Sequence, residues 1–537
     1  MNITAKAISD MIKIRCAEDI DRAAEKKSVS ALLGEHFAYQ TAVTADELDL
    51  FKISVHSEIE KYITVYFVKD VIMDFPAYPY DDDGDYLTTA PGKMPDLLVP
   101  AARQNGCVRA QPGYFVLWID VNLPRDAKAG SFDIEILICG EKASAKSVVT
   151  LNIKDAVLPE QKLIFTQWFH VDCIAAAHGV PVYGSEHWEL IEKYIKMAAH
   201  LGITMILTPV ITPPLDTEIG SRRPCTQLVK ITEKDGIYSF DFTLLKRWIE
   251  LCLKNGIKYF EISHLFSQWG LEYSPNIVVN GEYMFGWHVK AADPAYGGFL
   301  KQFIPALREL LRSEGVEERC FFHISDEPRV EHLEAYRFAY DLLTPLLEGC
   351  RVMDAISDFD FYETGLIKTP VTATNYIEPF LEHDIENLWA YYCCGQGNKV
   401  GNRFFAMPHY RGRILGLQLY KYGMEGFLQW GYNFYYSSQS VYEINPYTTT
   451  SADRGFPSGD AFTVYPGKNG PLPSARGFVF LDAIQDIALC RKLEEKIGKD
   501  AVVRLIEEEA GMKITFSEYP RNDEFIPRLA DKIREML

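Results

Sequence analysis

The sequence predicts an α/β protein in which a (β/α)8 TIM-type barrel follows an N-terminal β-sandwich domain. In roughly the first 155 residues, short runs alternate apolar and polar residues with period two and are separated by turn signals. From about residue 160, strand-like and helix-like segments alternate eight times over about 340 residues. The 537 residues are enough for both domains and a large core.

The composition is typical of a soluble globular protein, with 47% hydrophobic and 24% charged residues. A net charge of -19 repels nucleic acid and anionic membranes, so we expect neither as a partner. No stretch reaches the roughly 18 apolar residues of a membrane span. The N-terminus shows no basic-then-apolar signal pattern, and we therefore expect a cytoplasmic protein.

The cysteines indicate a reducing compartment. Their number, eleven, is odd, and no Cys-x-x-Cys spacing occurs, although Cys393 and Cys394 are neighbours. We expect reduced thiols and no structural zinc. We also expect no other metal and no cofactor.

Residues 1–158 are assigned to the sandwich. The clearest strand patterns are residues 51–57, 62–68, 114–124, 131–138 and 148–154. Between two of these strands, residues 73–92 form a long irregular segment rich in Pro, Tyr and Asp. Its Asp81-Asp-Asp-Gly-Asp85 run resembles part of a calcium loop but lacks the rest of an EF-hand pattern, so we expect a solvated acidic loop.

Residues 159–498 are assigned to the barrel, and residues 499–537 to a C-terminal helical extension. The predicted strands are residues 164–170, 204–209, 258–264, 319–327, 351–356, 371–375, 388–393 and 426–431. The predicted helices are residues 187–201, 242–254, 299–313, 330–347, 408–423 and 476–496. The fifth and sixth helices have weak patterns.

The fourth strand ends in two adjacent carboxylates, Asp326 and Glu327, followed at once by Pro328. Proline cannot donate to a strand ladder, so the strand should end at this pair. Alternation with the apolar Phe322 and Ile324 points Glu327 into the barrel, and Asp326 can join it only where the strand bends. Paired carboxylates at a strand tip suit acid–base chemistry on a sugar. The alternative is ordinary capping of the following helix.

Barrel enzymes place their active sites on the loops after the strands, so the strand ends supply further candidates. The candidate substrate-binding residues are His170, His264, Trp269, His323, Trp389, Tyr391, Tyr392, Trp430, Asn433, Asp460 and Tyr465. Each also has a structural explanation: the histidines as satisfied polar residues, Trp269 as a cover of the barrel mouth, and Asp460 as a turn cap.

Four segments resemble glycoside hydrolase family 123, which includes β-N-acetylgalactosaminidases. They are His323-Ile-Ser-Asp-Glu-Pro328, Trp389-Ala-Tyr-Tyr392, Gly426-Phe-Leu-Gln-Trp-Gly-Tyr-Asn433 and Gly459-Asp-Ala-Phe-Thr-Val-Tyr-Pro-Gly467. The resemblance covers nearly the whole chain. It implies a catalytic Asp-Glu pair at Asp326 and Glu327. It also implies an oligosaccharide or glycoconjugate with a terminal N-acetylhexosamine as substrate.

The expected function is therefore that of a retaining exo-β-N-acetylhexosaminidase, with N-acetylgalactosamine favoured. The sugar's 2-acetamido oxygen would attack its own anomeric carbon and form an oxazolinium intermediate. Glu327 would act as the acid and then the base, and Asp326 would orient the acetamido group. Tyr391 or Tyr392 could bind the acetamido oxygen, while Trp389 and Trp430 could wall the sugar ring.

Three alternatives remain open at this point. The first is a metal-dependent barrel hydrolase using His170, His264 and His323. The second is a carbohydrate-binding protein with an inactive site. The third is a glycosidase for a sugar without an acetamido group, in which Glu261 or Asp460 would be the nucleophile.

Overall fold

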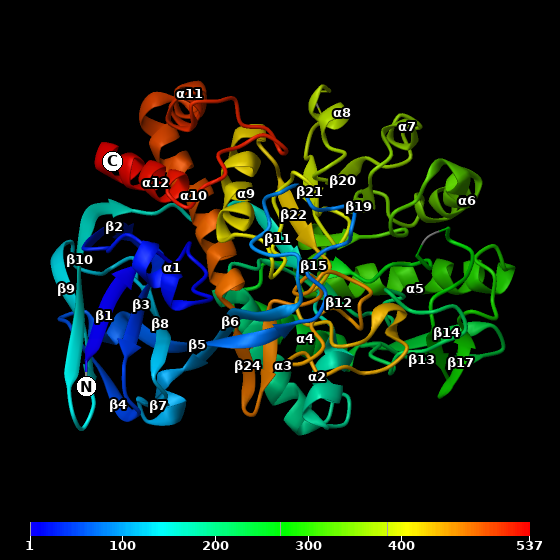
Figure 1. Ribbon diagram of the computed structural model, residues 1–537. Coiled ribbons are helices and arrows are strands. Elements are labelled where there is room, and N and C mark those ends of the chain that lie inside the picture. The colour runs from blue at the N-terminus through cyan, green and yellow to red at the C-terminus, as the bar shows by residue number, and fades with distance from the viewer. Residues whose placement is uncertain (1, 269, 384) are drawn as a thin grey trace.

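The computed structural model of the protein describes residues 2–268, 270–383 and 385–537. A two-sheet β-sandwich lies beside a closed barrel of eight parallel strands (Figure 1). The predicted fold class is confirmed. The domain boundaries at residues 158 and 498 remain predictions.

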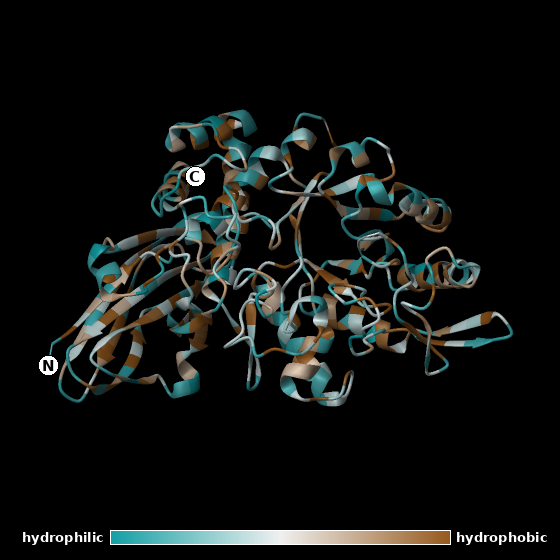
Figure 2. Ribbon diagram, turned by 45° about the vertical axis from the view of Figure 1, so that its right-hand side comes forward, coloured by the Kyte–Doolittle hydropathy of each residue, from teal (hydrophilic) through white to brown (hydrophobic). Residues whose placement is uncertain are grey.

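The sandwich consists of two five-stranded sheets. The first contains, in spatial order, β1 (Ile3–Ile8), β3 (His36–Ala45), β8 (Gly113–Asn122), β5 (Ile63–Met73) and β6 (Gly92–Pro100). The second contains β2 (Ser28–Leu33), β10 (Ser144–Val157), β9 (Gly130–Cys139), β4 (Asp49–His56) and β7 (Cys107–Ala110). Alternate residues of the facing strands, such as Leu117 and Ile119 of β8 and Ile134 and Ile136 of β9, form the core between the sheets. Figure 2 shows this alternation as brown and pale or teal bands along the strands.

The barrel strands lie in chain order around the barrel, as the eight predicted segments require. They are β11 (Ile164–Gln167), β12 (Met205–Thr208), β15 (Tyr259–Ile262), β18 (Cys320–Phe322), β19 (Arg351–Ile356), β20 (Thr369–Ala373), β21 (Trp389–Tyr391) and β22 (Gly426–Gln429). No barrel strand has more residues than its predicted segment. The residues beyond the strand ends therefore turn away from the ladder and line the mouth of the barrel.

Helices cover the barrel as expected, with one-turn helices where the patterns were weak. The main helices are α2 (Val171–His178), α3 (Ser185–His200), α4 (Thr243–Lys254), α5 (Pro294–Ser313), α6 (Leu333–Leu343), α9 (His409–Tyr422) and α10 (Ala475–Ile497). The fifth and sixth positions hold only α7 (Phe359–Tyr362) and α8 (Glu378–Leu381). The loops around these short helices leave the barrel mouth open on that side.

Besides α2, which no predicted helix covers, two features of the barrel region were not predicted. A four-stranded sheet of order β14-β13-β16-β17 packs beside α5, built from β13 (Lys230–Lys234), β14 (Ile237–Asp241), β16 (Ile277–Val279) and β17 (Glu282–Phe285). A hairpin of β23 (Val464–Gly467) and β24 (Gly470–Pro473) precedes α10. Both are insertions after strand ends, where loop length carries little constraint from the barrel.

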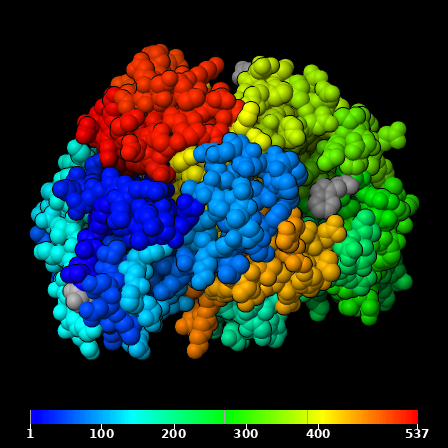
Figure 3. Space-filling view, in the orientation of Figure 1, coloured from blue at the N-terminus to red at the C-terminus, as the bar shows by residue number. Residues whose placement is uncertain are grey.

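The segment between β5 and β6 is not a solvated loop, which corrects the expectation for residues 73–92. Asp83 forms an ion pair with the fully buried Arg411 at 3.0 Å, and Asp85 pairs with Arg521 at 2.7 Å. The hydroxyl of Tyr78 donates to the Gly455 carbonyl at 2.6 Å. Figure 3 shows this segment as a bright blue mass between the red C-terminal helices and the orange loops after β22. Asp83 neutralises the buried Arg411 and Asp85 pairs with the partly buried Arg521, so the sandwich contributes directly to the barrel mouth.

The sandwich also packs on the outside of the barrel through α10. Trp118 of β8 stacks on Phe478 of α10, with ring centroids 6.2 Å apart. Below them, Arg476 of α10 binds Asp96 of β6 through two hydrogen bonds of 2.8 and 3.1 Å, and both side chains are buried. An apolar face with a buried ion pair at its edge therefore fixes the two parts together.

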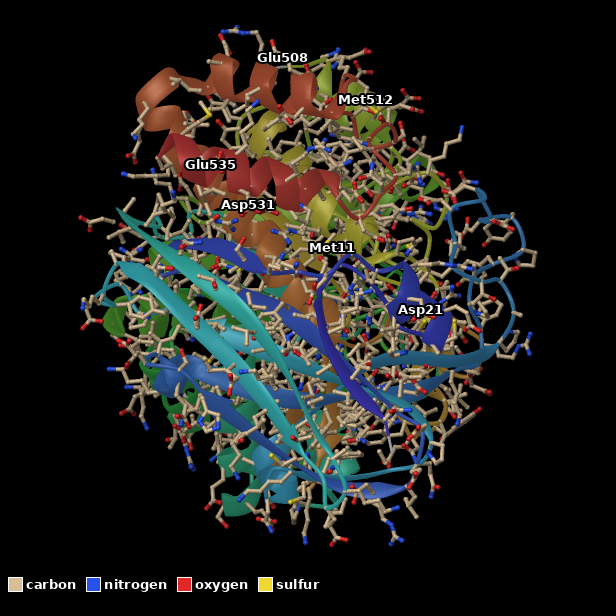
Figure 4. All side chains as sticks on the ribbon, turned by 60° about the vertical axis from the view of Figure 1, so that its left-hand side comes forward. Met11, Asp21, Glu508, Met512, Asp531 and Glu535 are labelled. Atoms are coloured by element: carbon tan, nitrogen blue, oxygen red, sulfur yellow. The ribbon has the colours of Figure 1, made fainter. Side chains whose placement is uncertain are left out.

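The predicted C-terminal extension forms two helices, α11 (Lys499–Ala510) and α12 (Phe525–Met536). Figure 4 shows α12, with Asp531 and Glu535 labelled, lying above the sandwich strands. Ser30 of β2 donates to Asp531 at 2.8 Å, and Arg534 pairs with the buried Glu35. In the part of the chain that the structure describes, no helix combines the length and apolar character needed to cross a membrane.

Candidate active site

The segment that carries Asp326 and Glu327 leaves the barrel early. The fourth strand was predicted to run to Glu327, but β18 ends at Phe322. Glu327 has a φ of 47°, a left-handed conformation that costs a non-glycine residue about 1–3 kcal/mol. The N-caps of the helical turns that follow are Arg329 and His332, so neither carboxylate has the alternative role of a helix cap. The chain bends at the pair, and both side chains reach one cavity.

Asp354, at the fourth position of β19, causes this bend. Its Oδ1 accepts the backbone N–H groups of Ile324 (3.0 Å) and Ser325 (3.3 Å), which a continuing strand would use in the sheet. The alternation predicted here is nevertheless confirmed. Phe322 and Ile324 pack outward against helices, while Phe321 belongs to the cluster inside the barrel.

His323 lies below the pair, between two carboxylates. Its Nε2 is 2.9 Å from Glu261 and its Nδ1 is 3.2 Å from Asp354, and all three side chains are buried. Burial alone would lower the pKa of His323, but the hydrogen bonds and charges of these carboxylates raise it to about 10. His323 is therefore an imidazolium ion at neutral pH.

Glu261 is saturated by this arrangement. Besides His323 it accepts hydrogen bonds from Thr166 (2.6 Å) and from the indole nitrogen of Trp168 (2.7 Å). It is fully buried and does not line the cavity. Its carboxylate supports the floor of the site.

Asp326 is buried and held by one amide. Gln268 donates to its Oδ2 at 2.7 Å, and the same amide accepts the backbone N–H of Asp216 at 2.5 Å, which fixes the amide's orientation. Burial and the adjacent charge of Glu327 raise the pKa of Asp326 to about 8. Asp326 therefore carries a proton at neutral pH in the free protein.

Glu327 is more exposed than Asp326 and is bound by a tyrosine. The hydroxyl of Tyr391 donates to its Oε1 at 2.6 Å and lies 3.1 Å from the hydroxyl of Ser357. Glu327 also lines the cavity, where its carboxyl group can exchange a proton with a ligand. Such a geometry suits a general acid.

A cavity opens above the pair. Its apolar walls are Trp168, Leu215, Ala355, Leu428, Trp430 and Phe456. Its polar lining is His170, Asp216, Gln268, Asp326, Glu327 and Tyr391, with Cys393 and Cys394 at one side. Aromatic walls with a few convergent polar groups are typical of a small-molecule site.

His170 is fixed in one neutral form. Its Nδ1 accepts from Arg223 (3.1 Å) and its Nε2 donates to the Trp430 carbonyl (3.1 Å). Burial and the positive charge of Arg223 lower the pKa of His170 to about 3. Arg223 is itself held by two hydrogen bonds of 2.7 Å to Asp172. This ion pair between Arg223 and Asp172 is buried.

Trp430 is held by the carboxylate predicted as a candidate alternative nucleophile. Its indole nitrogen donates to Asp460 Oδ2 at 2.8 Å, and Gln429 donates to Oδ1 at 3.2 Å. Burial raises the pKa of Asp460 to about 6. Asp460 does not line the cavity, so its contribution is to orient the tryptophan.

The predicted site residues fall into three groups: those that line the cavity, those that support it from behind, and those that lie away from it. Those that line the cavity are Asp326, Glu327, His170, Tyr391 and Trp430. Those that support it from behind are His323, His264, Asn433 and Asp460. Asn433 exchanges two hydrogen bonds with the His170 backbone, and His264 stacks on His323 with centroids 4.2 Å apart. Trp269 lies outside the described residues.

Three predicted residues lie away from the cavity, and the roles expected for them are corrected. Trp389 is the first residue of β21, at the bottom of the barrel, where its indole nitrogen donates to Glu425 at 2.9 Å. Tyr392 points outward, because side chains alternate along the strand and its neighbour Tyr391 points inward. Its ring packs on Phe427, with ring centroids 5.0 Å apart. The Tyr465 hydroxyl donates to Asp96 at 2.6 Å, in the contact with the sandwich.

Nine of the cavity residues were not among the predicted site residues, namely Trp168, Leu215, Asp216, Gln268, Ala355, Cys393, Cys394, Leu428 and Phe456. Trp168 and Gln268 follow strand ends and could have been included on that ground. Leu215, Asp216 and Phe456 lie deep in long loops, where no periodicity indicates direction.

A metal site built from histidines is not formed by the predicted residues. Both ring nitrogens of His170 and of His323 are engaged by protein groups. Within residues 2–268, 270–383 and 385–537, no group of three or more His, Cys, Asp or Glu side chains is placed to hold a metal ion.

Comparison with known proteins identifies a family and a similar fold. A sequence model described as the glycoside hydrolase 123 catalytic domain matches residues 168–493. A structure described as "The details of glycolipid glycan hydrolysis by the structural analysis of a family 123 glycoside hydrolase from Clostridium perfringens" is similar in fold. Its TM-score is 0.76 at 15% identity, covering 100% of this chain and 98% of that chain.

More distant structures add little. β-Glucuronidases from Parabacteroides merdae and Bacteroides uniformis align with TM-scores of 0.31 and 0.29, at 10% and 12% identity. The alignments cover 83% and 85% of this chain and 50% of each of theirs, and such scores support no argument. A search of curated protein sequences found no match.

The raised pKa of Asp326 predicts that this residue destabilises the fold. Between about pH 4 and about pH 8 the carboxyl is ionised in the unfolded chain but protonated in the folded protein, so stability falls as pH rises. Asp326→Asn keeps an acceptor for Gln268 and removes this effect. We expect a gain of at least about 2 kcal/mol in unfolding free energy at about pH 8 and little gain near pH 4.

Denaturant unfolding across this pH range measures the effect. Asp126→Asn, a change at an exposed turn of the sandwich, is the control and should alter stability at neither pH. An Asp326→Asn protein no more stable than the wild type at about pH 8 would contradict the burial argument.

Proposed function

The chain belongs to glycoside hydrolase family 123, and we propose that it is a retaining exo-β-N-acetylhexosaminidase that uses substrate-assisted catalysis, with N-acetylgalactosamine as the favoured sugar. The observation that carries this proposal is the adjacency of Asp326 and Glu327 at one bend, each held by its own partner and both facing one cavity. These two residues are proposed as the catalytic pair.

Adjacency favours this mechanism over a protein nucleophile. Retaining enzymes with a protein nucleophile hold the two carboxyls about 5 Å apart on either side of the scissile bond, whereas substrate-assisted enzymes are exceptions. Two consecutive residues on one strand tip approach the sugar from one side. Glu261 and Asp460, the candidates for a separate nucleophile, are both outside the cavity lining.

One further carboxylate, Asp216, does line the cavity. Its Oδ2 accepts the backbone N–H of Gln439 at 3.0 Å, and burial raises its pKa to about 6. We propose that it binds sugar hydroxyls. It is also the residue that a glycosidase for a sugar without an acetamido group would use, so the experiment below separates the two functions.

In the first step, the acetamido oxygen of the substrate attacks C1. The bond between C1 and the leaving oxygen breaks, and Glu327 transfers its proton to that oxygen. Asp326, as a carboxylate, accepts the acetamido N–H and stabilises the positive charge of the oxazolinium ring. In the second step Glu327 takes a proton from water, the water oxygen attacks C1, and the bond between C1 and the acetamido oxygen breaks.

Glu327 must carry a proton when the bond breaks. In the free protein, burial and the adjacent charge raise the pKa of Asp326 to about 8, so Asp326 holds the proton. An N–H donor from the substrate favours the ionised form of Asp326 and moves the proton to Glu327. Tyr391, which donates to Glu327 in the free protein, can then turn its single hydrogen towards the acetamido oxygen.

The walls are suited to a single terminal sugar. Trp430, fixed by Asp460, presents an apolar face, and neutral His170 lies beside it. An oligosaccharide or glycoconjugate that ends in N-acetylhexosamine is therefore the proposed substrate. The Clostridium perfringens relative is described as acting on glycolipid glycans, and a glycolipid is one such glycoconjugate. A cytoplasmic location also remains a proposal.

Matched aryl β-glycosides test the proposal directly. We expect the 2-acetamido galactoside to be cleaved fastest, the 2-acetamido glucoside more slowly, and the 2-hydroxy counterparts slower by at least about 1,000-fold, since intramolecular attack is lost. Comparable rates on 2-hydroxy sugars, with a sugar trapped as an ester on Asp216, would contradict the proposal.

Replacing the acid tests the role of Glu327. Glu327→Gln should lower kcat/KM on natural oligosaccharides by about 10²–10⁴-fold, and should affect an aryl glycoside with a good leaving group less, because that group departs without a proton. Glu331→Gln, at an exposed glutamate four residues further along, is the matched control and should leave both rates unchanged. Equal losses on both substrates would assign Glu327 another role.

A further inference from the structure

We propose that the open groove beside Glu327 binds the leaving-group part of the substrate, and that it accepts neutral sugars and disfavours sugars carrying a uronate or sulfate. This inference rests on the proposed glycosidase function and adds the identity of the second half of the substrate. The groove is lined by residues that follow β18, β19, β20 and β21, and we call it the leaving-group groove.

The leaving-group groove begins at the proposed acid. Four residues line both it and the cavity, namely Glu327, Tyr391, Cys393 and Cys394. The group that accepts the proton of Glu327 must be within hydrogen-bonding distance of it, on the side away from the sugar that is cleaved off. A chain attached to that oxygen therefore enters the groove directly.

Side chains that follow other barrel strands line the remaining sides of the cavity. Trp168 and His170 follow β11, Leu215 and Asp216 follow β12, and Phe456 lies in the loop after β22. On the groove side the corresponding helices, α7 and α8, have only four residues each, and the loops leave an open channel. The terminal sugar would therefore occupy the cavity and the rest of the glycan the groove, which gives exo cleavage.

The groove has the groups that bind a neutral sugar. Tyr376 follows β20 and is 54% exposed, so its ring can stack on a pyranose face while its hydroxyl remains in water. Gln396 is buried in the floor, where it donates to Asn375 (2.9 Å) and accepts from the Cys393 backbone (2.7 Å). Gln396 is held by the backbone and in turn fixes the orientation of the Asn375 amide. The Asn375 amide can then form hydrogen bonds with sugar hydroxyls.

The charges of the groove are mostly negative. Besides Glu327, its lining includes Asp358, Asp360 and Glu378, and among the residues that the structure describes the lining has one cation, Arg329. Asp360 and Glu378 are exposed and face an open channel, so the field they produce acts on any ligand that lies there. A uronate or sulfate next to the scissile bond would be repelled, and a neutral hexose would not.

Two trisaccharides with the same terminal sugar test the charge rule. One has a neutral hexose next to the scissile bond and the other the corresponding uronic acid. We expect the wild type to cleave the neutral one with a kcat/KM at least about tenfold higher, a difference that shrinks as ionic strength rises. Equal values at low salt would overturn the proposal.

Two variants test the residues. Tyr376→Ala should raise KM for the neutral trisaccharide about tenfold and leave an aryl glycoside, which barely enters the groove, unchanged. The double change Asp360→Asn with Glu378→Gln should raise kcat/KM on the uronate substrate and leave the neutral one unchanged. An equal effect of Tyr376→Ala on the neutral trisaccharide and on the aryl glycoside would overturn the assignment. So would a double change that does not raise kcat/KM on the uronate substrate.

Matched changes outside the groove serve as controls. Tyr442→Ala removes an exposed tyrosine that lines neither the cavity nor the groove. Glu508→Gln with Glu535→Gln, on α11 and α12 and labelled in Figure 4, removes the same total charge as the double change. Neither should alter the ratio of the two trisaccharides.

The test is independent of which sugar occupies the cavity. If the aryl glycosides show that the terminal sugar lacks an acetamido group, the proposed function fails, and the same trisaccharide pair is made with the sugar that is cleaved. The neutral-to-uronate ratio then still supports or overturns the leaving-group groove.

Discussion

Two hydrogen bonds from the backbone to Asp354 determine the geometry of the whole site. By accepting the N–H groups of Ile324 and Ser325, Asp354 removes them from the sheet and ends β18 at Phe322. The chain can then bend, and two consecutive residues, Asp326 and Glu327, can both face the cavity. In a continuing strand, successive side chains point to opposite faces and only one of the two could do so.

The bend depends on buried charge that is balanced locally. His323, as an imidazolium ion, lies between Glu261 and Asp354, so its buried positive charge contacts a carboxyl group on each side. Glu261 in turn holds Trp168, and Trp168 is a wall of the cavity. The strained φ of Glu327 and the buried carboxyl of Asp326 reduce the stability of the fold, and both are features expected of a site shaped for chemistry.

Much of this arrangement could be predicted from sequence. It follows from the alternation of apolar and polar residues along each strand and from the position of each residue along its strand. The eight barrel strands follow from apolar runs of the right length, and the outward packing of Phe322 and Ile324 follows from alternation along the strand. The same alternation separates Tyr391, which faces the cavity, from Tyr392, which packs on Phe427. Depth along the strand separates Tyr391 from Trp389, which lies at the bottom of the barrel.

The remainder depends on contacts between distant segments, which no local pattern encodes. The acidic residues Asp83 and Asp85 have the composition of a solvated loop, yet their partners, Arg411 and Arg521, lie more than 300 residues away in the chain. Asp216 and Phe456 reach the cavity from long loops without regular structure. Arg223 is charged but buried, because Asp172 and His170 neutralise and orient it.

The central claim, that the substrate's own acetamido oxygen attacks C1 with Asp326 orienting it, is tested most directly by weakening that nucleophile without altering the protein. Aryl glycosides with acetamido, fluoroacetamido, difluoroacetamido and trifluoroacetamido groups differ in the electron density of this oxygen. We expect kcat/KM to fall steadily along the series, by at least about 100-fold overall, equivalent to ~2.7 kcal/mol of lost assistance. A rate independent of fluorination would contradict the mechanism and indicate a nucleophile supplied by the protein.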